Sequence, residues 1–199
     1  MQIELQNIGK KYNKDWIFRN LNYEFKSGNS YAVTGHNGSG KSTLLQIISG
    51  FVLPTEGQAF CDEFHSNILY QQIAIAAPYL ELIEEMTAIE FLQFHQHFKS
   101  FIGNISMPQI LEEVQLSQAA NKQIRYFSSG MKQRLKLAQA FFSNTKVLLL
   151  DEPTSNLDKQ GINLYLQLIK QYSNDRLVII CSNDENEYSF CNQKLEIGK

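Results

Sequence analysis

A glycine-rich segment near residue 40 constrains the fold of this chain more than any other feature. Residues 35–43 read Gly-His-Asn-Gly-Ser-Gly-Lys-Ser-Thr. The largely apolar run at residues 30–34 before it predicts a strand, and the apolar spacing from Lys41 to about Gly50 predicts a half-buried helix. A strand, a glycine loop and a helix in this order predict one unit of a parallel α/β sheet.

The loop has the spacing G-x-x-x-x-G-K-S, which is typical of a phosphate-binding P-loop. Glycines let successive backbone N–H groups converge on phosphates at the positive end of the helix. Lys41 is predicted to neutralise charge on the phosphates during catalysis, and Ser42 to give an oxygen to Mg²⁺. A glycine turn that binds nothing is the alternative, and the flanking strand and helix argue against it. The residues predicted to contact the nucleotide here are Gly35, His36, Asn37, Gly38, Ser39, Gly40, Lys41, Ser42 and Thr43.

Two carboxylates follow a second buried strand. Residues 147–150, Val-Leu-Leu-Leu, are continuously apolar, as in a parallel strand covered on both faces. Asp151 and Glu152 come next, at the sheet edge where open α/β sheets bind ligands. We predict that Asp151 holds Mg²⁺ and that Glu152 is the general base for an attacking water. A capped turn would explain this pair if it stood alone, but the P-loop makes catalysis the better interpretation.

The remaining patterns predict one α/β domain over residues 1–199. Residues 3–8 and 16–25 partly alternate apolar with polar residues and predict an antiparallel β edge. A helix is expected at 159–172, and further strands at 177–181 and 194–197. The fold class is therefore a P-loop NTPase with a mostly parallel sheet flanked by helices.

A helical subdomain is predicted at about residues 80–142, inserted in the α/β core. Thr87 with Glu90 fits a capping box, and segments beginning at Ser106 and Ser129 carry further start signals. Phenylalanines at helical spacing after Thr87 are expected in the core. They are Phe91, Phe94 and Phe98.

Composition and the minor residue types exclude several classes of protein. Hydrophobic residues make up 43% of the chain, charged residues 19%, and the formal net charge is −2. This balance indicates a soluble globular protein and no direct nucleic-acid partner. We find neither a secretory signal nor an apolar run long enough to span a bilayer, so membrane contact is expected only through a partner chain.

Cysteine and histidine spacing predicts no metal centre. The three cysteines, Cys61, Cys181 and Cys191, are odd in number and lack C-x-x-C spacing, which argues against disulfides and zinc. His95 and His97 stand two apart, so on a helix they would point to different faces. Both are expected on the solvated surface.

The segment Phe-Ser-Ser-Gly-Met-Lys-Gln-Arg at residues 127–134 resembles the L-S-G-G-Q signature of the ATP-binding cassette (ABC) ATPase family. The same family is suggested by Ser-Asn-Leu-Asp at residues 155–158, which resembles the D-loop. The resemblance implies that two domains pair head to tail, with each ATP between the P-loop of one and the signature of the other. It assigns nucleotide contacts outside the P-loop to Tyr12, Ser128, Ser129, Gly130 and Asp158, although packing is an alternative role for Tyr12.

The chain departs from the family at two positions that contact the γ-phosphate. Tyr79 follows Pro78 where the family has glutamine, and Asn183 stands where the family has its switch histidine. A phenol offers a metal no carboxamide oxygen, and asparagine does not carry a proton charge. Both residues are still expected to lie at the nucleotide, and the two replacements predict slow or partner-gated hydrolysis.

The resemblance implies an ATPase subunit of a membrane transporter, with ATP and Mg²⁺ as cofactors. A separately encoded transmembrane permease is the expected partner, and the second cassette is either another copy or a different ABC subunit. The expected location is cytoplasmic, at the inner face of the membrane. Two alternatives remain: a soluble ABC ATPase that remodels a cytoplasmic complex, and an ATP-sensing module with little turnover.

Overall fold

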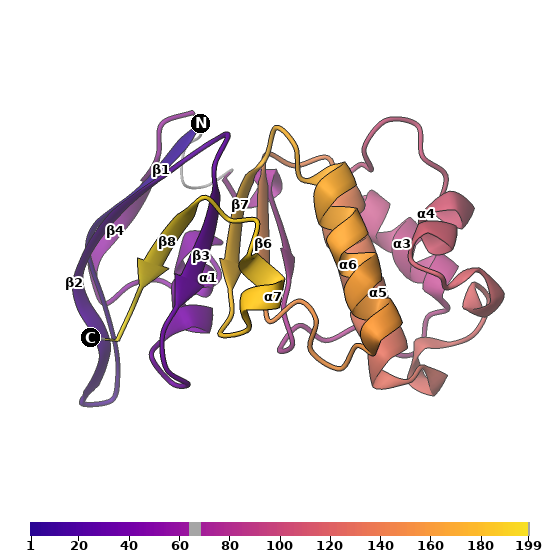
Figure 1. Cartoon of the computed structure of the whole chain (residues 1–199), viewed down its shortest axis with the longest axis horizontal. Coiled ribbons are helices and arrows are strands. Elements are labelled where there is room, and N and C mark those ends of the chain that lie inside the picture. The colour runs from indigo at the N-terminus through magenta and orange to yellow at the C-terminus, as the bar shows by residue number, and fades with distance from the viewer. Residues whose placement is uncertain (64–68, 199) are drawn as a thin grey trace.

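The structure is a computed structural model that describes residues 1–63 and 69–198. Its strands form two sheets, and helices cover the outer face of the larger sheet (Figure 1). The smaller sheet is antiparallel and has the order β2-β1-β4. Its strands are β1 (Gln2–Tyr12), β2 (Asp15–Lys26) and β4 (Glu56–Cys61). The predicted antiparallel edge is thus a separate sheet, and its third strand, β4, was missed because residues 56–61 show weak alternation.

The larger sheet is entirely parallel and has the order β5-β6-β7-β3-β8. Its strands are β3 (Ser30–Thr34), β5 (Ile73–Ala76), β6 (Val147–Asp151), β7 (Leu177–Cys181) and β8 (Gln193–Glu196). Cys181 pairs with Val33 on one side and with Asp151 on the other. This register brings the carboxyl ends of β3, β6 and β7 to one edge, where the predicted P-loop and the two carboxylates meet.

Side chains of the central strands alternate between two cores. In β6, Val147 and Leu149 pack in one buried cluster, while Leu148 and Leu150 pack in the other. The first cluster includes α1 (Lys41–Ile48) and the apolar face of the antiparallel sheet. The second includes residues of α5 (Ser129–Phe142) and α6 (Lys159–Tyr172), which lie side by side in Figure 1. The continuous apolar runs follow from this, because a strand covered on both faces has no solvent side.

The remaining helices are short. Thr87 is the N-cap of α3 (Ala88–Gln96) and forms the capping box that the sequence predicts. Ser106, the predicted start of a capped segment, is the N-cap of α4 (Met107–Glu113) and forms a capping box with Gln109. These helices are shorter than the predicted helical stretch, because turns and 3₁₀ segments separate them. The other helical elements are α3 (Ala88–Gln96), α4 (Met107–Glu113), α7 (Glu185–Tyr188) and the 3₁₀ turns η1 (Tyr70–Gln72), η2 (Ser117–Ala119) and η3 (Ile124–Tyr126).

Two sequence interpretations on α3 are wrong, for one reason. The core-facing stripe of this helix contains Ala88, Phe91, Leu92 and His95, at the i, i+3, i+4, i+7 spacing. Phe94 and Phe98 lie outside the stripe and are 41% and 69% exposed, with their rings packed on each other. His95 occupies the fourth position of the stripe instead, so its imidazole is partly buried and not fully solvated.

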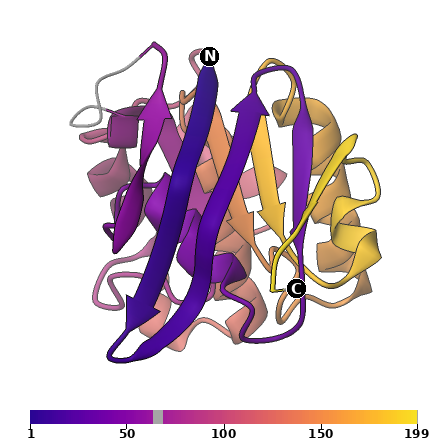
Figure 2. The same ribbon diagram turned by 90° about the vertical axis from the view of Figure 1, so that its left-hand side faces the viewer.

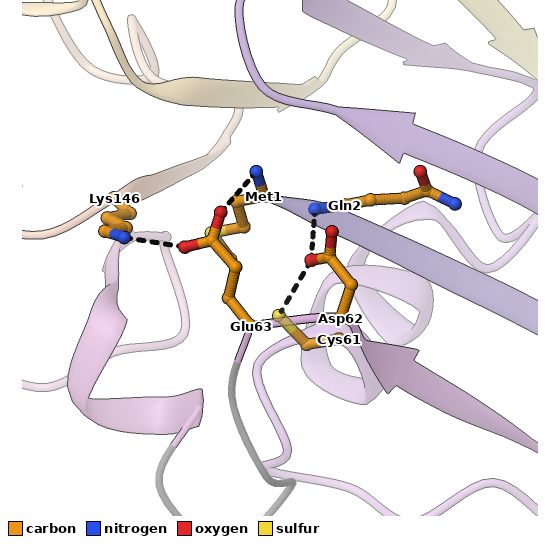
Figure 3. Close-up of polar contacts among 6 residues, drawn as sticks. All are labelled: Met1, Gln2, Cys61, Asp62, Glu63 and Lys146. Carbon is orange, nitrogen blue, oxygen red and sulfur yellow. Dashed lines mark hydrogen bonds and ion pairs between the residues drawn. The ribbon is translucent and has the colours of Figure 1, made fainter.

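Polar contacts join the beginning of the chain to the end of β4 and to the residue before β6 (Figure 3). The Glu63 carboxylate, just after β4, contacts the Met1 nitrogen and also accepts from Lys146 Nζ at 2.6 Å. The Gln2 backbone N–H donates to Asp62 at 2.7 Å. These contacts join β1, β4 and the start of β6, and so connect the two sheets. Figure 2 shows β1 and β2 facing the viewer in front of the parallel strands.

In the described part of the chain, no helix combines the length and apolar composition needed to cross a membrane. The three cysteines are free thiols, and Cys181 is buried.

Candidate functional site

The glycine loop between β3 and α1 has a backbone that only glycine can adopt at two points. Gly35 has φ 152° and Gly40 has φ 97°. A Cβ atom would stand 2.3 Å from the Ile197 carbonyl oxygen at the first position, and 2.4 Å from the Ile17 Cγ2 atom at the second. Side chains are therefore excluded, and the chain folds closely around the start of α1, whose first N–H groups have no partner within the helix.

Polar groups inside this loop are arranged for an anion. Lys41 is 7% exposed, and its Nζ donates to the carbonyl oxygens of Gly35 at 2.7 Å and His36 at 3.3 Å. The ammonium group therefore lies over the loop, where phosphate oxygens would compete for its protons. The Ser39 hydroxyl is buried and has no hydrogen-bond partner among the described residues. An orphaned hydroxyl beside a cation and helix N–H groups fits a phosphate ligand.

Asp151 and Ser42 meet at the edge of the sheet. Asp151 is 2% exposed, and its carboxylate hydrogen-bonds the Ser42 side chain. Burial, and secondarily the charge of Glu152, raise the pKa of Asp151 to about 6, against the lowering effects of Ser42 and Lys41. A carboxylate and a hydroxyl are hard oxygen donors of the kind that Mg²⁺ prefers. Residues 1–63 and 69–198 contain no group of three or more His, Cys, Asp or Glu side chains that could hold a metal. An ion here would need further oxygens from phosphate and water.

Glu152 leaves the end of β6 in an unusual conformation. Its φ is 42°, in the left-handed region, although the residue is not glycine. Its backbone N–H donates to the Cys181 carbonyl at 2.9 Å, which continues the β6–β7 ladder by one residue. The side chain is exposed at the same edge as the P-loop. A carboxylate in this position is free to contact water at the phosphate.

The two residues that depart from the family pattern lie against the site. The Tyr79 phenol contacts the Gln46 carboxamide on α1, and its pKa is raised mainly by burial and then by the charge of Asp151. Asn183 donates from Nδ2 to the Asn37 side-chain oxygen in the glycine loop, at 3.0 Å. The structure thus places Asn183 against the P-loop and Tyr79 near Asp151. That either residue contacts the nucleotide stays a prediction.

The signature residues form the start of α5. Ser128 is the N-cap of this helix and accepts from the Met131 N–H at 3.2 Å. A Cβ atom at Gly130 would lie 3.1 Å from the Asn156 carbonyl oxygen, so the signature packs on the D-loop. Asp158 is the N-cap of α6 and accepts from the Gly161 N–H at 2.8 Å. Within the described ranges, no hydrogen bond joins Ser128, Ser129 or Gly130 to residues 35–43.

Tyr12 ends β1, and its side chain is 47% exposed. Lys10 Nζ lies 5.0 Å from the centre of the Tyr12 ring. Among the described residues, no hydrogen bond or ring contact joins Tyr12 to the glycine loop, and an exposed aromatic side chain is suited to stacking. Its role stays a prediction.

Sequence reasoning missed several residues that contact the site. Phe18, on β2, lies beside Gly40 and helps to close the glycine loop. Gln133 donates from Nε2 to the Pro153 carbonyl at 2.8 Å, and Glu187 accepts from the Thr154 N–H at 2.7 Å. Gln133 was within the quoted signature segment, but its partner is distant in sequence. No pattern in the sequence singles out Glu187.

Comparisons with known proteins agree with this geometry. A family model described as ABC transporter matches residues 18–155. The uncharacterised ABC transporter ATP-binding protein YybJ of Bacillus subtilis (strain 168) is 31% identical over 201 residues, covering 98% of this chain and 92% of YybJ. The cytochrome c biogenesis ATP-binding export protein CcmA of Haemophilus influenzae is 29% identical, covering 99% and 95%. The lantibiotic transport ATP-binding protein SrtF of Streptococcus pyogenes is 30% identical, covering 91% and 79%.

Solved structures give the same result. The dimeric structure of MJ0796, a bacterial ABC transporter cassette, has a TM-score of 0.84 and 26% identity, covering 98% of this chain and 94% of that chain. The dimeric post-hydrolysis state of MJ0796 bound to ADP and Pi has a TM-score of 0.82 at 25% identity, with the same coverage. The predicted family and fold class are confirmed. The chain belongs to the ABC transporter family, and it is an ATP-binding ATPase subunit of that family.

Proposed function

We propose that this chain binds Mg-ATP in residues 35–43 and pairs with a second cassette whose signature completes the site. The observation that carries the proposal is the glycine loop, in which the buried Lys41 ammonium, the unpartnered Ser39 hydroxyl and the Ser42–Asp151 pair converge. Cations and N–H groups in this arrangement recognise a chain of phosphates and a hard metal ion. Residues 35–43 would cradle the phosphates, and Tyr12 would stack on the adenine.

The proposed mechanism assigns one task to each residue. Ser42 and Asp151 would hold Mg²⁺, which when bound supplies positive charge next to the phosphates. Lys41 neutralises charge that develops on the γ-phosphate. Glu152 accepts a proton from the attacking water and orients it. Glu152 has a left-handed backbone at the end of the buried strand, and its side chain is exposed at this edge.

The second half of each site comes from the other cassette. Ser128, Ser129 and Gly130 begin α5, and N–H groups at the start of a 14-residue helix favour an anion such as a γ-phosphate. Asp158 lies on the adjoining D-loop side of this surface. We propose that ATP holds the two cassettes together and that hydrolysis releases them. The helices within about residues 80–142 would move as a subdomain in this cycle.

Tyr79 and Asn183 favour slow ATP hydrolysis unless binding of a partner moves these two side chains. Asn183 Nδ2 donates one of its two hydrogens to Asn37 at 3.0 Å, which leaves one hydrogen for a γ-phosphate but no proton charge. Tyr79 offers a phenol beside Asp151 where a carboxamide oxygen would coordinate a metal directly. This combination also favours the ATP-sensing alternative over a fast soluble ATPase.

A separately encoded transmembrane permease is the proposed partner, and the chain would work at the cytoplasmic face of the membrane. An apolar pocket beside Tyr79 supports this, because exposed Phe51 and Tyr70 line it together with Lys99. Phe51 is 73% exposed, which is unusual for so large an apolar side chain. A segment of the partner docked here would contact Tyr79 and through it the region of Asp151.

Co-purification tests the partner. The chain should come out of detergent-solubilised membranes with an integral membrane protein, and Phe51→Ser should weaken that association. Leu166→Ser changes an exposed apolar residue on α6 and is the matched control. Recovery of the wild-type chain with only soluble proteins would instead support the remodelling alternative.

Steady-state ATPase measurements test the site. Glu152→Gln should abolish most turnover because the amide cannot accept the proton. The double change Tyr79→Gln with Asn183→His should raise turnover about tenfold or more if these two residues limit it. Unchanged turnover in Glu152→Gln would remove Glu152 from the role of base.

A further inference from the structure

One peptide group just after Glu152 is held at both ends by buried side chains. The carbonyl oxygen of Pro153 accepts from Gln133 Nε2 at 2.8 Å. The N–H of the same peptide belongs to Thr154 and donates to Glu187 Oε1 at 2.7 Å. The Thr154 hydroxyl donates to that oxygen as well. Gln133 lies on α5 and Glu187 on α7, so two helices fix the orientation of a single peptide plane.

The burial of these two side chains is costly and therefore informative. Gln133 and Glu187 are each 3% exposed. Glu187 Oε2 is buried and has no hydrogen-bond partner among the described residues. An apolar side chain would fill this space without that desolvation penalty. The backbone around Glu187 is itself fixed, because the buried Tyr165 hydroxyl donates to its carbonyl oxygen at 2.7 Å.

The segment that this peptide belongs to is strained. Glu152 has φ 42° and Asn156 has φ 65°, both in the left-handed region. A left-handed backbone at a residue such as glutamate persists only when neighbouring contacts hold it. On the strand side, the Glu152 N–H is bonded to the Cys181 carbonyl. On the other side, Gln133 and Glu187 supply the restraint.

We propose that Gln133 and Glu187 are positioning residues for ATP hydrolysis, acting as a clamp on the Pro153–Thr154 peptide that aims the Glu152 carboxylate. This inference rests on the proposed role of Glu152 as base. The clamp also joins two regions that face nucleotide. Gln133 lies one turn into the helix that begins with the signature, and Glu187 lies four residues after Asn183. A shift of either helix would thus change the direction of Glu152.

The test separates positioning from binding and from folding. Single-turnover hydrolysis at saturating Mg-ATP and the Kd for ATP by calorimetry are measured for Gln133→Met and Glu187→Ala. Each variant should slow hydrolysis about tenfold or more, because small errors in the position of a catalytic group have large kinetic effects. The Kd should stay within about twofold of wild type, since in the described part of the chain neither side chain hydrogen-bonds residues 35–43.

Two further variants isolate the hydrogen bonds. Glu187→Gln keeps an acceptor oxygen for Thr154 and should restore the rate to within about threefold of wild type. Glu185→Gln removes an exposed carboxylate from the same short helix and should have no effect. The double variant Gln133→Met with Glu187→Ala should be hardly slower than either single variant, because both act on one peptide.

Several results would overturn the clamp. Full activity of Gln133→Met or Glu187→Ala, while Glu152→Gln is inactive, would refute the clamp and leave the base assignment intact. A loss of rate matched by an equal loss of ATP affinity would show a structural role only. An active Glu152→Gln would refute both assignments together. If circular dichroism shows that Glu187→Ala does not fold, Thr154→Val replaces it, because this change removes one clamp bond without opening a cavity. The hydrolysis rate of Thr154→Val must then fall while its Kd for ATP stays that of wild type.

Discussion

His95 should make the folded chain lose stability as the pH falls below neutrality. Its imidazole lies in the core-facing stripe of α3, stacked on Phe101 with ring centres 5.8 Å apart. The Ser143 hydroxyl donates its single proton to the Gln139 carbonyl, so its oxygen accepts from His95 Nε2 at 2.8 Å. Burial, and secondarily the charge of Lys99, lower the pKa of His95 from 6.5 to about 4.

The sign and size of the effect follow from these two pKa values. Because the unfolded chain has the higher pKa, it takes up the proton first as the pH falls, so stability is lost from about pH 6.5 down to about pH 4. Between pH 8 and pH 5 the loss assigned to His95 is about 2 kcal/mol, and it approaches about 3 kcal/mol below pH 4.

Urea unfolding at pH 8, 7, 6 and 5 measures this loss. His95→Gln keeps a donor for Ser143 but does not titrate, so its free energy of unfolding should fall about 2 kcal/mol less than that of wild type over this range. His97→Gln changes the exposed histidine two residues later and should follow the wild-type curve. Parallel curves for wild type and His95→Gln down to pH 5 would refute the reasoning.

Other changes test the loop, the helix caps and the core. Lys41→Ala should weaken ATP binding about 100-fold in the presence of Mg²⁺, because it removes the one lysine or arginine of residues 35–43. Equal Kd values for the wild type and the variant, measured by calorimetry, would contradict the P-loop assignment. Gly40→Ala should cost about 3 kcal/mol in urea unfolding because its Cβ would clash, whereas Gly38→Ala, with φ 84° but open space, should cost about 1 kcal/mol. Arg176→Met should lower the free energy of unfolding by about 3 kcal/mol, because buried Arg176 donates to two carbonyl oxygens at the end of α5. A thermal unfolding midpoint within about 2–3 °C of the wild-type value would contradict this. Leu92→Ala should cost about 2–5 kcal/mol, the usual range for a fully buried leucine.

Local chemistry determined the parts of this protein that the sequence predicts well. The P-loop, the β6 strand with Asp151 and Glu152, and the start of α5 at Ser129 each depend on neighbouring residues only. Glycines at strained positions, caps three residues from their partners and apolar runs are all visible in a short window. The family resemblance then supplied the order of these motifs, and the solved cassettes confirm that fold.

Only the tertiary structure decided contacts between segments far apart in the chain. The separate antiparallel sheet depends on β4, whose pairing with β1 is not encoded by its own alternation. Phe94 and Phe98 are exposed while His95 is partly buried, because the direction in which α3 faces is set by its neighbours, not by which residues are most apolar. Gln133 and Glu187 meet at one peptide across distances of 20 and 33 residues, and a hydrogen bond of that kind depends on how helices pack against the sheet.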